Sequence, residues 1–547
     1  MDPAKRKVLA TLPAGHTALA PVLSPDGKSL YICNRFNNDV SVFDLAARRE
    51  VRRIAVQREP VAADLTKDGR FLLVANHLHT GRADVEDVAA VVSVIDVAAG
   101  NVVKELRLPT GSGVLNDLRV SPDGKYAAVT HLVASFNRAA SQVRSGWMNA
   151  NALTLIDLAR MEVHYTVLLD QPGSGAANPW GLAWSADSAT LVAAHAGTHE
   201  VSVIAVPALL DGIREAERTH PQGHQPGGSK RPDAQVRAPS RAAKPTLAFI
   251  SRYEGLAEGP PFLVGARQRV KLPSGDLGPR PVAIAGHTAY VANYFSDTLS
   301  LIDLAAPQPN AQSIPLGRAE VRKQKAEMDQ VRKGEFYFHD ASICQQGWQS
   351  CASCHPAEGR ADGLNWDLLN DGIGNPKNTK SLLLAHRTPP AMWLGVRETA
   401  GTAVRAGIEH ILFTQQPEEV AAAIDEYLKS LKPVPSPYLA HGRLSKEAGR
   451  GKQVFARAGC GDCHPPGRFT DLHQYEVGTR RGFDRPADKF DTPTLIELWR
   501  TAPYLHDGSA ATVRDVLTTR NPQGQHGATS TLSTQELNDL CAYLLSL

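Results

Sequence analysis

The sequence predicts a multidomain protein in which an all-β propeller precedes mainly α-helical domains. Two observations carry this prediction: short strand-like units that open with an Asp-Gly turn recur through the first half, and two Cys-x-x-Cys-His segments lie in the second. The chain of 547 residues exceeds what one hydrophobic core usually organises, so several domains are expected. The formal net charge of +3 creates no bulk field that would favour nucleic acid or an anionic membrane. The sequence contains no apolar run of about eighteen residues, so it predicts no membrane-spanning helix.

The repeated unit is clearest where Ser24-Pro25-Asp26-Gly27-Lys28 precedes Ser29-Leu30-Tyr31-Ile32-Cys33-Asn34. Similar turns occur at Thr66-Lys67-Asp68-Gly69-Arg70 and Ser121-Pro122-Asp123-Gly124-Lys125. Asp-Gly pairs between β-rich stretches are typical of hairpins. Units that recur at about 40 to 60 residues predict the blades of a propeller, where radial packing protects the sheet edges. Five units are clear and there is room for two more, so we predict seven blades.

The units resemble the YVTN family of β-propellers, named for a strand like Tyr290-Val291-Ala292-Asn293. This resemblance implies a fold but little about function, because propellers host many roles. Residues from about 207 to 246 interrupt the repeats, and Gly, Pro, Lys, Arg and Gln dominate their second half. We therefore predict a mobile surface insertion there.

The two Cys-x-x-Cys-His segments have the attachment signature of a c-type haem. They are Cys351-Ala352-Ser353-Cys354-His355 and Cys460-Gly461-Asp462-Cys463-His464. In such a segment the two thiols form thioethers to the haem, and the adjacent imidazole becomes the proximal iron ligand. A zinc knuckle would need four nitrogen or sulfur ligands, and a redox dithiol would not need the histidine. We therefore predict two covalently bound haem c groups, with His355 and His464 as metal ligands.

The haem signatures also predict the compartment. Haem is attached to this motif outside the cytoplasmic membrane, so we expect a periplasmic protein. The first residues lack the apolar core of a signal peptide, and we expect that an export signal has been removed. The remaining cysteines, Cys33, Cys344 and Cys541, are odd in number, which argues against a disulfide framework.

The domain boundaries are placed where the pattern changes. We assign residues 1–318 to the propeller, 319–437 to the first cytochrome c domain and 438–547 to the second. An amphipathic helix is predicted at 417–431, and alternating prolines at 433–437 separate the two haem domains. The predicted fold class is thus an all-β seven-bladed propeller followed by mainly α dihaem cytochrome c domains.

Several further motifs accompany the haem signatures. They are Arg387-Thr388-Pro389-Pro390 with Trp393, Arg450-Gly451-Lys452 with Phe455, Thr501-Ala502-Pro503-Tyr504-Leu505-His506-Asp507-Gly508, and Leu532-Ser533 with Glu536. Together they resemble the bacterial dihaem cytochrome c peroxidase and MauG family. The resemblance implies that the first haem is the peroxidatic or oxygen-activating site and that the second transfers electrons. It further implies that Trp393 lies between the haems and that Ca²⁺ is bound between the haem domains.

The ligand opposite the second proximal histidine departs from the family pattern. The resemblance implies a Met or Tyr there, but no Met follows Cys463, and the expected stretch contains Asn521-Pro522-Gln523-Gly524-Gln525-His526-Gly527 instead. This loop is rich in turn residues and could present an imidazole to the iron. We predict His526 as the distal ligand, with His506 as its rival.

Opposite the first haem, the resemblance implies a glutamate that moves the protons of peroxide. Glu409 fits that place. Its neighbour His410 could do the same work, or could ligate the iron and close the site. Adjacent helical residues point about 100° apart, so only one of the two is expected to face the haem.

The expected function is that of a periplasmic dihaem oxidoreductase, either a peroxidase or a MauG-like oxidase. It would use hydrogen peroxide or a high-valent haem intermediate, with the propeller as a docking or substrate platform. The expected partners are peroxide, a small-molecule or protein substrate, and a periplasmic redox protein such as a small cytochrome c or a cupredoxin. The alternatives are a non-catalytic dihaem electron carrier and a redox sensor whose propeller is a binding module.

Overall fold

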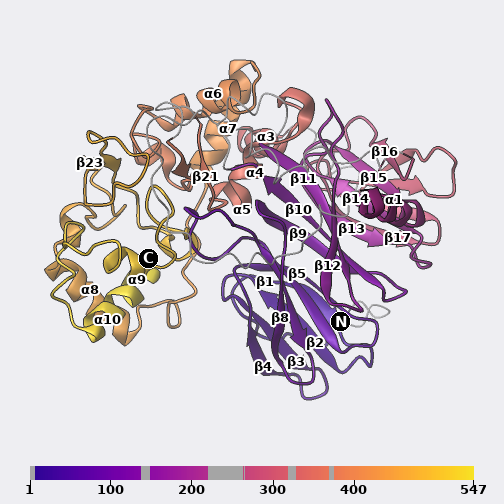
Figure 1. Cartoon of the computed structure of the whole chain (residues 1–547), viewed down its shortest axis with the longest axis horizontal. Helices are drawn as coiled ribbons and strands as arrows, with labels where there is room; N and C mark the ends of the chain where they lie inside the picture. The colour runs from indigo at the N-terminus through magenta and orange to yellow at the C-terminus, as the bar shows by residue number, and fades with distance from the viewer. Residues whose placement is uncertain (1–6, 137–147, 220–262, 264, 318–327, 369–374) are drawn as a thin grey trace.

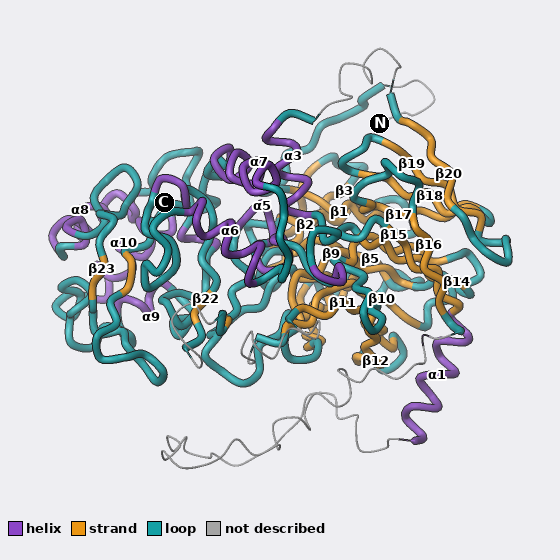
Figure 2. Tube along the Cα trace, turned by 90° about the horizontal axis from the view of Figure 1, so that it is seen from above, coloured by secondary structure: helices purple, strands orange, loops and turns teal. Residues whose placement is uncertain are grey.

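The structure is a computed structural model, and it describes residues 7–136, 148–219, 263, 265–317, 328–368 and 375–547. Four-stranded antiparallel sheets build the first part of the chain, and helices joined by long loops build the second (Figure 1). Seen from above, the strands gather at one end of the molecule and most helices at the other (Figure 2). The predicted order, a propeller-like β region followed by a helical region, is confirmed.

The described strands form five four-stranded sheets, each with its strands in sequence order. The first two are β1 (Ala18–Leu23), β2 (Ser29–Asn34), β3 (Asp39–Asp44), β4 (Arg49–Ala55), and β5 (Pro60–Leu65), β6 (Phe71–Asn76), β7 (Val91–Asp96), β8 (Asn101–Arg107). The third is β9 (Ser112–Val120), β10 (Tyr126–Ala134), β11 (Asn149–Asp157), β12 (Glu162–Leu168). The last two are β13 (Pro179–Trp184), β14 (Thr190–His195), β15 (Glu200–Ala205), β16 (Arg267–Lys271), and β17 (Pro279–Ala285), β18 (Thr288–Asn293), β19 (Thr298–Asp303), β20 (Ala311–Pro315).

Successive sheets pack on one another through their first strands, in the order β1, β5, β9, β13 and β17. Apolar side chains fill the space between the sheets, as in the buried cluster that contains Leu73, Val92 and Leu118. This radial arrangement is that of propeller blades.

The repeated sequence motif has two local structural causes. In the first blade, Asp26 Oδ1 accepts hydrogen bonds from Ser24 Oγ at 2.7 Å and from Lys28 N at 3.1 Å, and Gly27 supplies the positive φ of the turn. In every described blade a polar residue near the end of the second strand then bonds a hydroxyl on the third strand. These pairs, at 2.6 to 2.9 Å, are Asn34–Ser41, Asn76–Ser93, His131–Thr154, His195–Ser202 and Asn293–Ser300.

The described residues contain five blades, where we expected seven. At the interruption, β15 pairs directly with β16, with Ile204 opposite Arg267. The segment between these strands therefore interrupts the fourth blade between its third and fourth strands. Of the predicted insertion at 207–246, the beginning is helical and belongs to α1 (Val206–Thr219). The remainder lies outside the described residues.

The helical part contains α3 (Gln330–His339), η4 (Gln345–Gly347), α4 (Cys351–Cys354), α5 (Pro356–Gly359), η5 (Ala385–Arg387), α6 (Ala400–His410) and α7 (Glu418–Ser430). We call these elements, with the two-stranded sheet β21 (Asn365–Trp366) and β22 (Lys377–Asn378), the first module. The second module contains α8 (Lys446–Arg457), η6 (Cys460–Asp462), β23 (Gln474–Tyr475), β24 (Phe490–Asp491), η7 (Leu498–Arg500), α9 (Val513–Leu517) and α10 (Thr534–Leu545). The helix predicted at 417–431 is α7.

Each module is built on two crossing helices, α3 with α7 and α8 with α10. The crossing needs glycine on the first helix of each pair. A Cβ on Gly334 would lie 1.9 Å from Ala423 O, and a Cβ on Gly451 would lie 1.9 Å from Asp539 O. An aromatic pair follows in both modules, Phe338 with Tyr427 at 5.3 Å and Phe455 with Tyr543 at 5.4 Å between ring centroids. The two modules thus share one helical fold.

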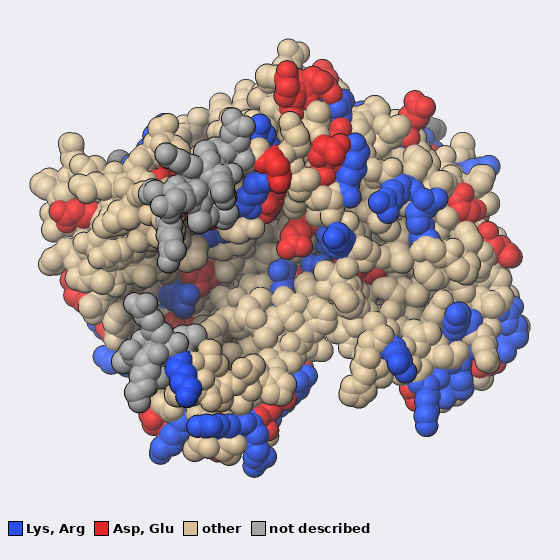
Figure 3. Space-filling view, turned by 180° about the vertical axis from the view of Figure 1, so that it is seen from behind, with Lys and Arg blue, Asp and Glu red and all other residues tan. Residues whose placement is uncertain are grey.

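The surface carries charges of both signs. On the face seen in Figure 3, lysine and arginine side chains alternate with aspartate and glutamate side chains among uncharged atoms. Within the described ranges, no helix has the length and apolar character that a membrane crossing needs.

Candidate haem sites

The first Cys-x-x-Cys-His segment forms the short helix α4. Ser350 caps it, and Ser350 and Ser353 form a reciprocal capping box. The ring of His355 follows, with Nδ1 3.1 Å from the carbonyl oxygen of Arg360. Because a carbonyl can only accept, Nδ1 carries the proton and Nε2 is the nitrogen that can bind a metal. Burial lowers the pKa of His355 to about 4, which keeps the ring neutral, as ligation requires.

The second segment repeats this arrangement. Nδ1 of His464 lies 2.8 Å from the carbonyl oxygen of Phe469, so Nε2 is again the candidate ligand atom. The ring of His526 faces that of His464, with 6.5 Å between centroids and 39° between planes. An imidazole nitrogen lies about 2 Å from a bound transition metal, so two opposed imidazoles on one metal have their ring centres roughly 6 Å apart. The pair fits one iron between them.

The loop that presents His526 is held by Asn521. The Asn521 side chain accepts a hydrogen bond from His526 N at 2.8 Å and donates to the carbonyl oxygens of His526 and Gly527 at 3.0 Å. Its amide also donates to Thr529 Oγ1 at 2.8 Å. Burial and the neighbouring His464 lower the pKa of His526 to about 4. The loop therefore presents a neutral ring in a defined place.

The donor sets fit haem c better than zinc. In the part of the chain that the structure describes, no group of three or more His, Cys, Asp or Glu side chains converges on one point. A structural zinc site would require such a group. A haem brings four equatorial nitrogens of its own and asks only for thiols and axial ligands, which is what each segment supplies.

The two proximal histidines differ in what faces them. Within the described residues, no aromatic or imidazole ring faces His355 as His526 faces His464. The residues predicted for that place, Glu409 and His410, lie at the end of α6. Their side chains are 62% and 55% exposed and approach each other to 4.0 Å. The structure thus brings neither of them to a buried position beside His355.

The segments that follow α6 and α9 are held by different kinds of hydrogen bond in the two modules. In the second module, Ala528 N donates to the carbonyl oxygen of Ala458, two residues before the first cysteine, at 3.0 Å. In the first module, the residue two before the first cysteine is Gln349, and its Nε2 donates to the carbonyl oxygen of Ile411 at 2.8 Å. Two residues before Ala528 is His526, and two residues before Ile411 is Glu409.

Trp393 and His506 occupy equivalent places in the two modules. Each follows a residue with φ near +70°, Met392 and Leu505, and each stands two residues before a glycine with φ of +60°. The carbonyl of Trp393 accepts from Asp491 N at 2.8 Å, and the carbonyl of His506 accepts from Asn378 N at 2.7 Å. Their rings meet between the modules, 6.5 Å apart at 72°.

His506 already has a partner on Nε2. That atom lies 2.8 Å from Asp484 Oδ2, and the ring stacks on Phe490 with 3.6 Å between centroids. Burial alone would raise the pKa of Asp484, but the hydrogen bond from His506 and the charge of Lys377 outweigh it and hold the pKa at about 2. The structure therefore ties His506 to a carboxylate at the contact between the modules.

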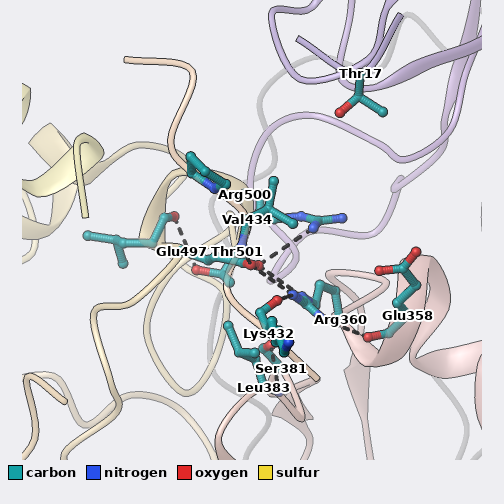
Figure 4. Close-up of polar contacts among 12 residues, drawn as sticks. Thr17, Glu358, Arg360, Ser381, Leu383, Lys432, Val434, Glu497, Arg500 and Thr501 are labelled. Carbon is teal, nitrogen blue, oxygen red and sulfur yellow. Dashed lines mark hydrogen bonds and ion pairs between the residues drawn. The ribbon is translucent and has the colours of Figure 1, made fainter. Parts of the chain in front are cut away.

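Buried ion pairs join the modules to each other (Figure 4). Arg360, whose carbonyl holds His355, donates from Nε and Nη2 to the carboxylate of Glu497 at 2.8 and 2.7 Å. Both side chains are at most 3% exposed. Arg500 lies 3.5 Å from the same carboxylate, and Val434 N donates to it at 2.6 Å.

A second group of buried charges joins the second module to the propeller. Arg58, at the start of the second blade, donates to the carbonyl oxygens of Arg500 and Ala502. Its neighbour Glu59 pairs with Arg35 at 2.7 Å. Burial would raise the pKa of Glu59, but the charges of Arg35, Arg500 and Arg58 hold it at about 2. None of these contacts could be inferred from the sequence, where the partners are far apart.

Comparisons with known proteins match both parts of the chain. The family described as "Lactonase, 7-bladed beta-propeller" matches residues 6–86, a range that includes β1 to β6. Hydrazine synthase subunit gamma of Kuenenia stuttgartiensis is 30% identical over 322 residues, covering 44% of this chain and 86% of that subunit. Methylamine utilization protein MauG of Methylorubrum extorquens is 26% identical over 247 residues, covering 35% of this chain and 67% of MauG. Cytochrome-c peroxidase IdrP2 of a Pseudomonas species is 26% identical over 296 residues, covering 40% and 80%.

Proposed function

Because its C-terminal part belongs to a family of dihaem oxidoreductases, we propose that the chain is a dihaem c-type enzyme that reacts with hydrogen peroxide. The family includes MauG, the cytochrome c peroxidases and hydrazine synthase subunit gamma. The members named here are enzymes. The reaction is either the reduction of peroxide by a donor protein or, in a MauG-like variant, the oxidation of a small-molecule or protein substrate.

The difference between the two proximal histidines is the observation that carries this proposal. His464 has an opposing imidazole at 6.5 Å, whereas His355 has none among the described residues. A haem held by Cys351, Cys354 and His355 would supply an iron with one side open to peroxide. Two imidazoles on the second haem would leave no place for a substrate there and would suit electron transfer.

Glu409 is the group that we assign to proton transfer at the first site. Cleavage of the O–O bond needs a base that takes the proton from one oxygen of peroxide and returns it to the departing oxygen. The Glu409 carboxylate can hold that proton, and the carbonyl of Ile411, two residues later, accepts from Gln349 Nε2, two residues before Cys351. His410 Nε2 lies 4.0 Å from the Glu409 carboxylate, which is too far for a direct hydrogen bond, so we assign His410 no share of that proton.

Electrons are proposed to pass between the modules at Trp393 and His506. These are aromatic rings in contact, and each is fixed by hydrogen bonds: Trp393 Nε1 donates to the carbonyl oxygen of Asn378 at 2.7 Å, and His506 is held by Asp484. The donor is proposed to be a periplasmic small cytochrome c or cupredoxin. The proposed domain limits remain 1–318, 319–437 and 438–547.

Peroxide turnover with a reduced donor tests this function. We expect the holoprotein to consume peroxide, and we expect cyanide to bind one haem of the two and to stop the reaction. Absence of turnover, with neither haem binding cyanide, would instead support the electron carrier or the redox sensor.

A further inference from the structure

The propeller contacts the segment that carries the first haem signature. Three of its asparagines make these contacts: Asn149 and Asn151 on β11, and Asn178 at the residue before β13. All three are buried. Buried amides stabilise a structure only when their hydrogen bonds are made, so their partners show what the amides hold in place.

Asn178 holds both serines of the capping box. Its Nδ2 donates to Ser350 Oγ at 2.8 Å, and its Oδ1 accepts from Ser353 Oγ at 2.8 Å. Ser353 is the second residue between the two cysteines. The propeller thus bonds to a side chain inside the haem signature itself.

Asn151 forms a hydrogen bond that fixes the backbone of Asn178. Its Oδ1 accepts from Asn178 N at 2.9 Å, and its Nδ2 donates to Asp170 Oδ1 at 2.8 Å and to the carbonyl oxygen of Trp348 at 3.0 Å. The fit between the two parts is close here, because a Cβ on Gly175 would lie 2.2 Å from Trp348 Cα. The contact therefore has little freedom to slide.

Asn149 contacts a sulfur that would become a thioether. Its Nδ2 lies 3.4 Å from Cys354 Sγ and 3.1 Å from Gln349 Oε1. A thioether sulfur retains lone pairs, so the amide can still donate to it after the haem is attached. In haem c this sulfur is bonded to a carbon of the macrocycle and not to the iron, so a hydrogen bond to it acts through the macrocycle, from which it withdraws electron density and thereby favours the reduced iron.

The second haem signature offers an internal comparison. Among the described residues, no propeller side chain makes a hydrogen bond to residues 460–464. In the second signature, Asp462 stands where the first has Ser353, and Gly461 stands where the first has Ala352. Among the described residues, the propeller therefore bonds to the haem signature of one module and not to that of the other, although the modules are similar.

We propose that Asn149 and Asn178 are positioning residues of the first haem site, which makes the propeller a fixed wall of that site in addition to any docking role. Asn178 sets the orientation of α4, and through it His355. Asn149 raises the reduction potential of the first haem through the sulfur of Cys354. The proposal rests on the proposed function only in taking the first haem as the reactive one.

The test is the midpoint potential of each haem, measured by spectroelectrochemistry on the holoprotein without peroxide. Asn149→Leu is nearly isosteric and removes the donor, so it should lower the potential of the first haem and leave that of the second unchanged. Asn293→Leu is the matched control, because Asn293 bonds Thr298 and Ser300 within its own blade, and it should move neither potential. Unchanged potentials in Asn149→Leu, or equal shifts of both haems, would overturn the proposal. If Asn149→Leu fails to retain two haems, Asn149→Ala removes the amide donor without adding a charge and should shift the potential of the first haem in the same direction.

A second pair of variants tests Asn178. Its φ is +56°, so Asn178→Gly removes the side chain without straining the backbone. Asn178→Gly and Ser353→Ala should each change the spectrum of the first haem, and the double variant should add little to either, because the two side chains act through one contact. Additive effects, or changes at the second haem, would contradict the assignment. Since peroxide is absent, this result is independent of whether the protein proves to be a peroxidase.

Discussion

The indole of Trp393 and the imidazole of His506 meet edge to face at 6.5 Å, and they are the same position in two copies of one module. The carbonyl of each residue accepts a hydrogen bond from the other module, from Asp491 N and Asn378 N respectively. The same position thus holds a tryptophan in the first module and a histidine in the second. As a result, a redox-active indole lies beside an imidazole that is bonded to a carboxylate. We propose that electrons pass between the two haem sites at this contact.

Replacement of Trp393 should slow electron transfer between the haems. In Trp393→Leu the indole is lost while the backbone bond to Asp491 can persist. We expect reduction of the first haem to lag behind that of the second by at least an order of magnitude more than in the wild type, measured by stopped flow. Trp366→Phe is the control, because Trp366 is buried in the same module and bonds Asp362 at 3.0 Å. Equal rates in Trp393→Leu and wild type would exclude this route.

His526 and His506 make opposite predictions as rival ligands. His526→Ala should open the second haem, so that its low-spin spectrum disappears and it binds cyanide. His506→Gln should leave that spectrum intact, because Nε2 of His506 is already bonded to Asp484. The electronic spectra of the two ferric variants show which histidine is the ligand of the second haem. Loss of the low-spin signal in His506→Gln alone would assign the ligand to His506.

Glu409 should matter for turnover and not for haem binding. A positioned acid–base group contributes about 10²-fold to 10⁴-fold to a rate. We therefore expect Glu409→Gln to lower peroxide turnover within that range, with two haems retained and the ferric spectrum unchanged. Glu398→Gln, an exposed glutamate of the same module, is the control and should keep full activity. A fully active Glu409→Gln would transfer the role to His410, for which His410→Gln is then the test.

Glu59 should make the folded protein sensitive to acid. Its pKa is about 2 in the folded chain, below the ordinary value of 4.5. A carboxylate with a depressed pKa contributes stability that is present above pH 4.5 and is lost as the pH falls towards 2. Glu59→Gln should abolish this component. At neutral pH the variant should also be destabilised, by about 3–5 kcal/mol, because the guanidinium groups of Arg35 and Arg58 lose their counter-charge.

Chemical denaturation at a series of pH values measures this effect. The control is Glu162→Gln, since the Glu162 carboxylate is 55% exposed and lies 3.8 Å from Lys104. Surface pairs of this kind contribute little. If Glu59→Gln and wild type lose stability in parallel between pH 4.5 and 2, the ion pairs of Glu59 do not stabilise the fold.

Local patterns were predictable from the sequence, and contacts between distant residues were not. The Asp26-Gly27 turn and the helix at Glu418–Ser430 depend on neighbours within a few positions, so the pattern suffices. The pairing of Ile204 with Arg267 could not be predicted, because it spans a long insertion. The contact of Asn149 with Cys354 joins residues 205 positions apart, and nothing local to either predicts it.

The internal duplication of the modules has a signal in the sequence itself. Thr388-Pro389-Pro390 and Thr501-Ala502-Pro503 begin stretches in which Trp393 and His506 stand at the same offset. Aligning the two stretches residue by residue pairs Trp393 with His506 on the sequence alone. The exposure of Glu409 and His410, by contrast, depends on how α6 packs, which the sequence does not reveal.

An unequal pair of irons is the central claim, and its most direct measurement is the electron paramagnetic resonance spectrum of the ferric holoprotein. We predict one high-spin and one low-spin signal of equal weight, with added cyanide converting only the high-spin one. Two low-spin signals that cyanide leaves unchanged would contradict this claim, because both irons would then be closed by the protein.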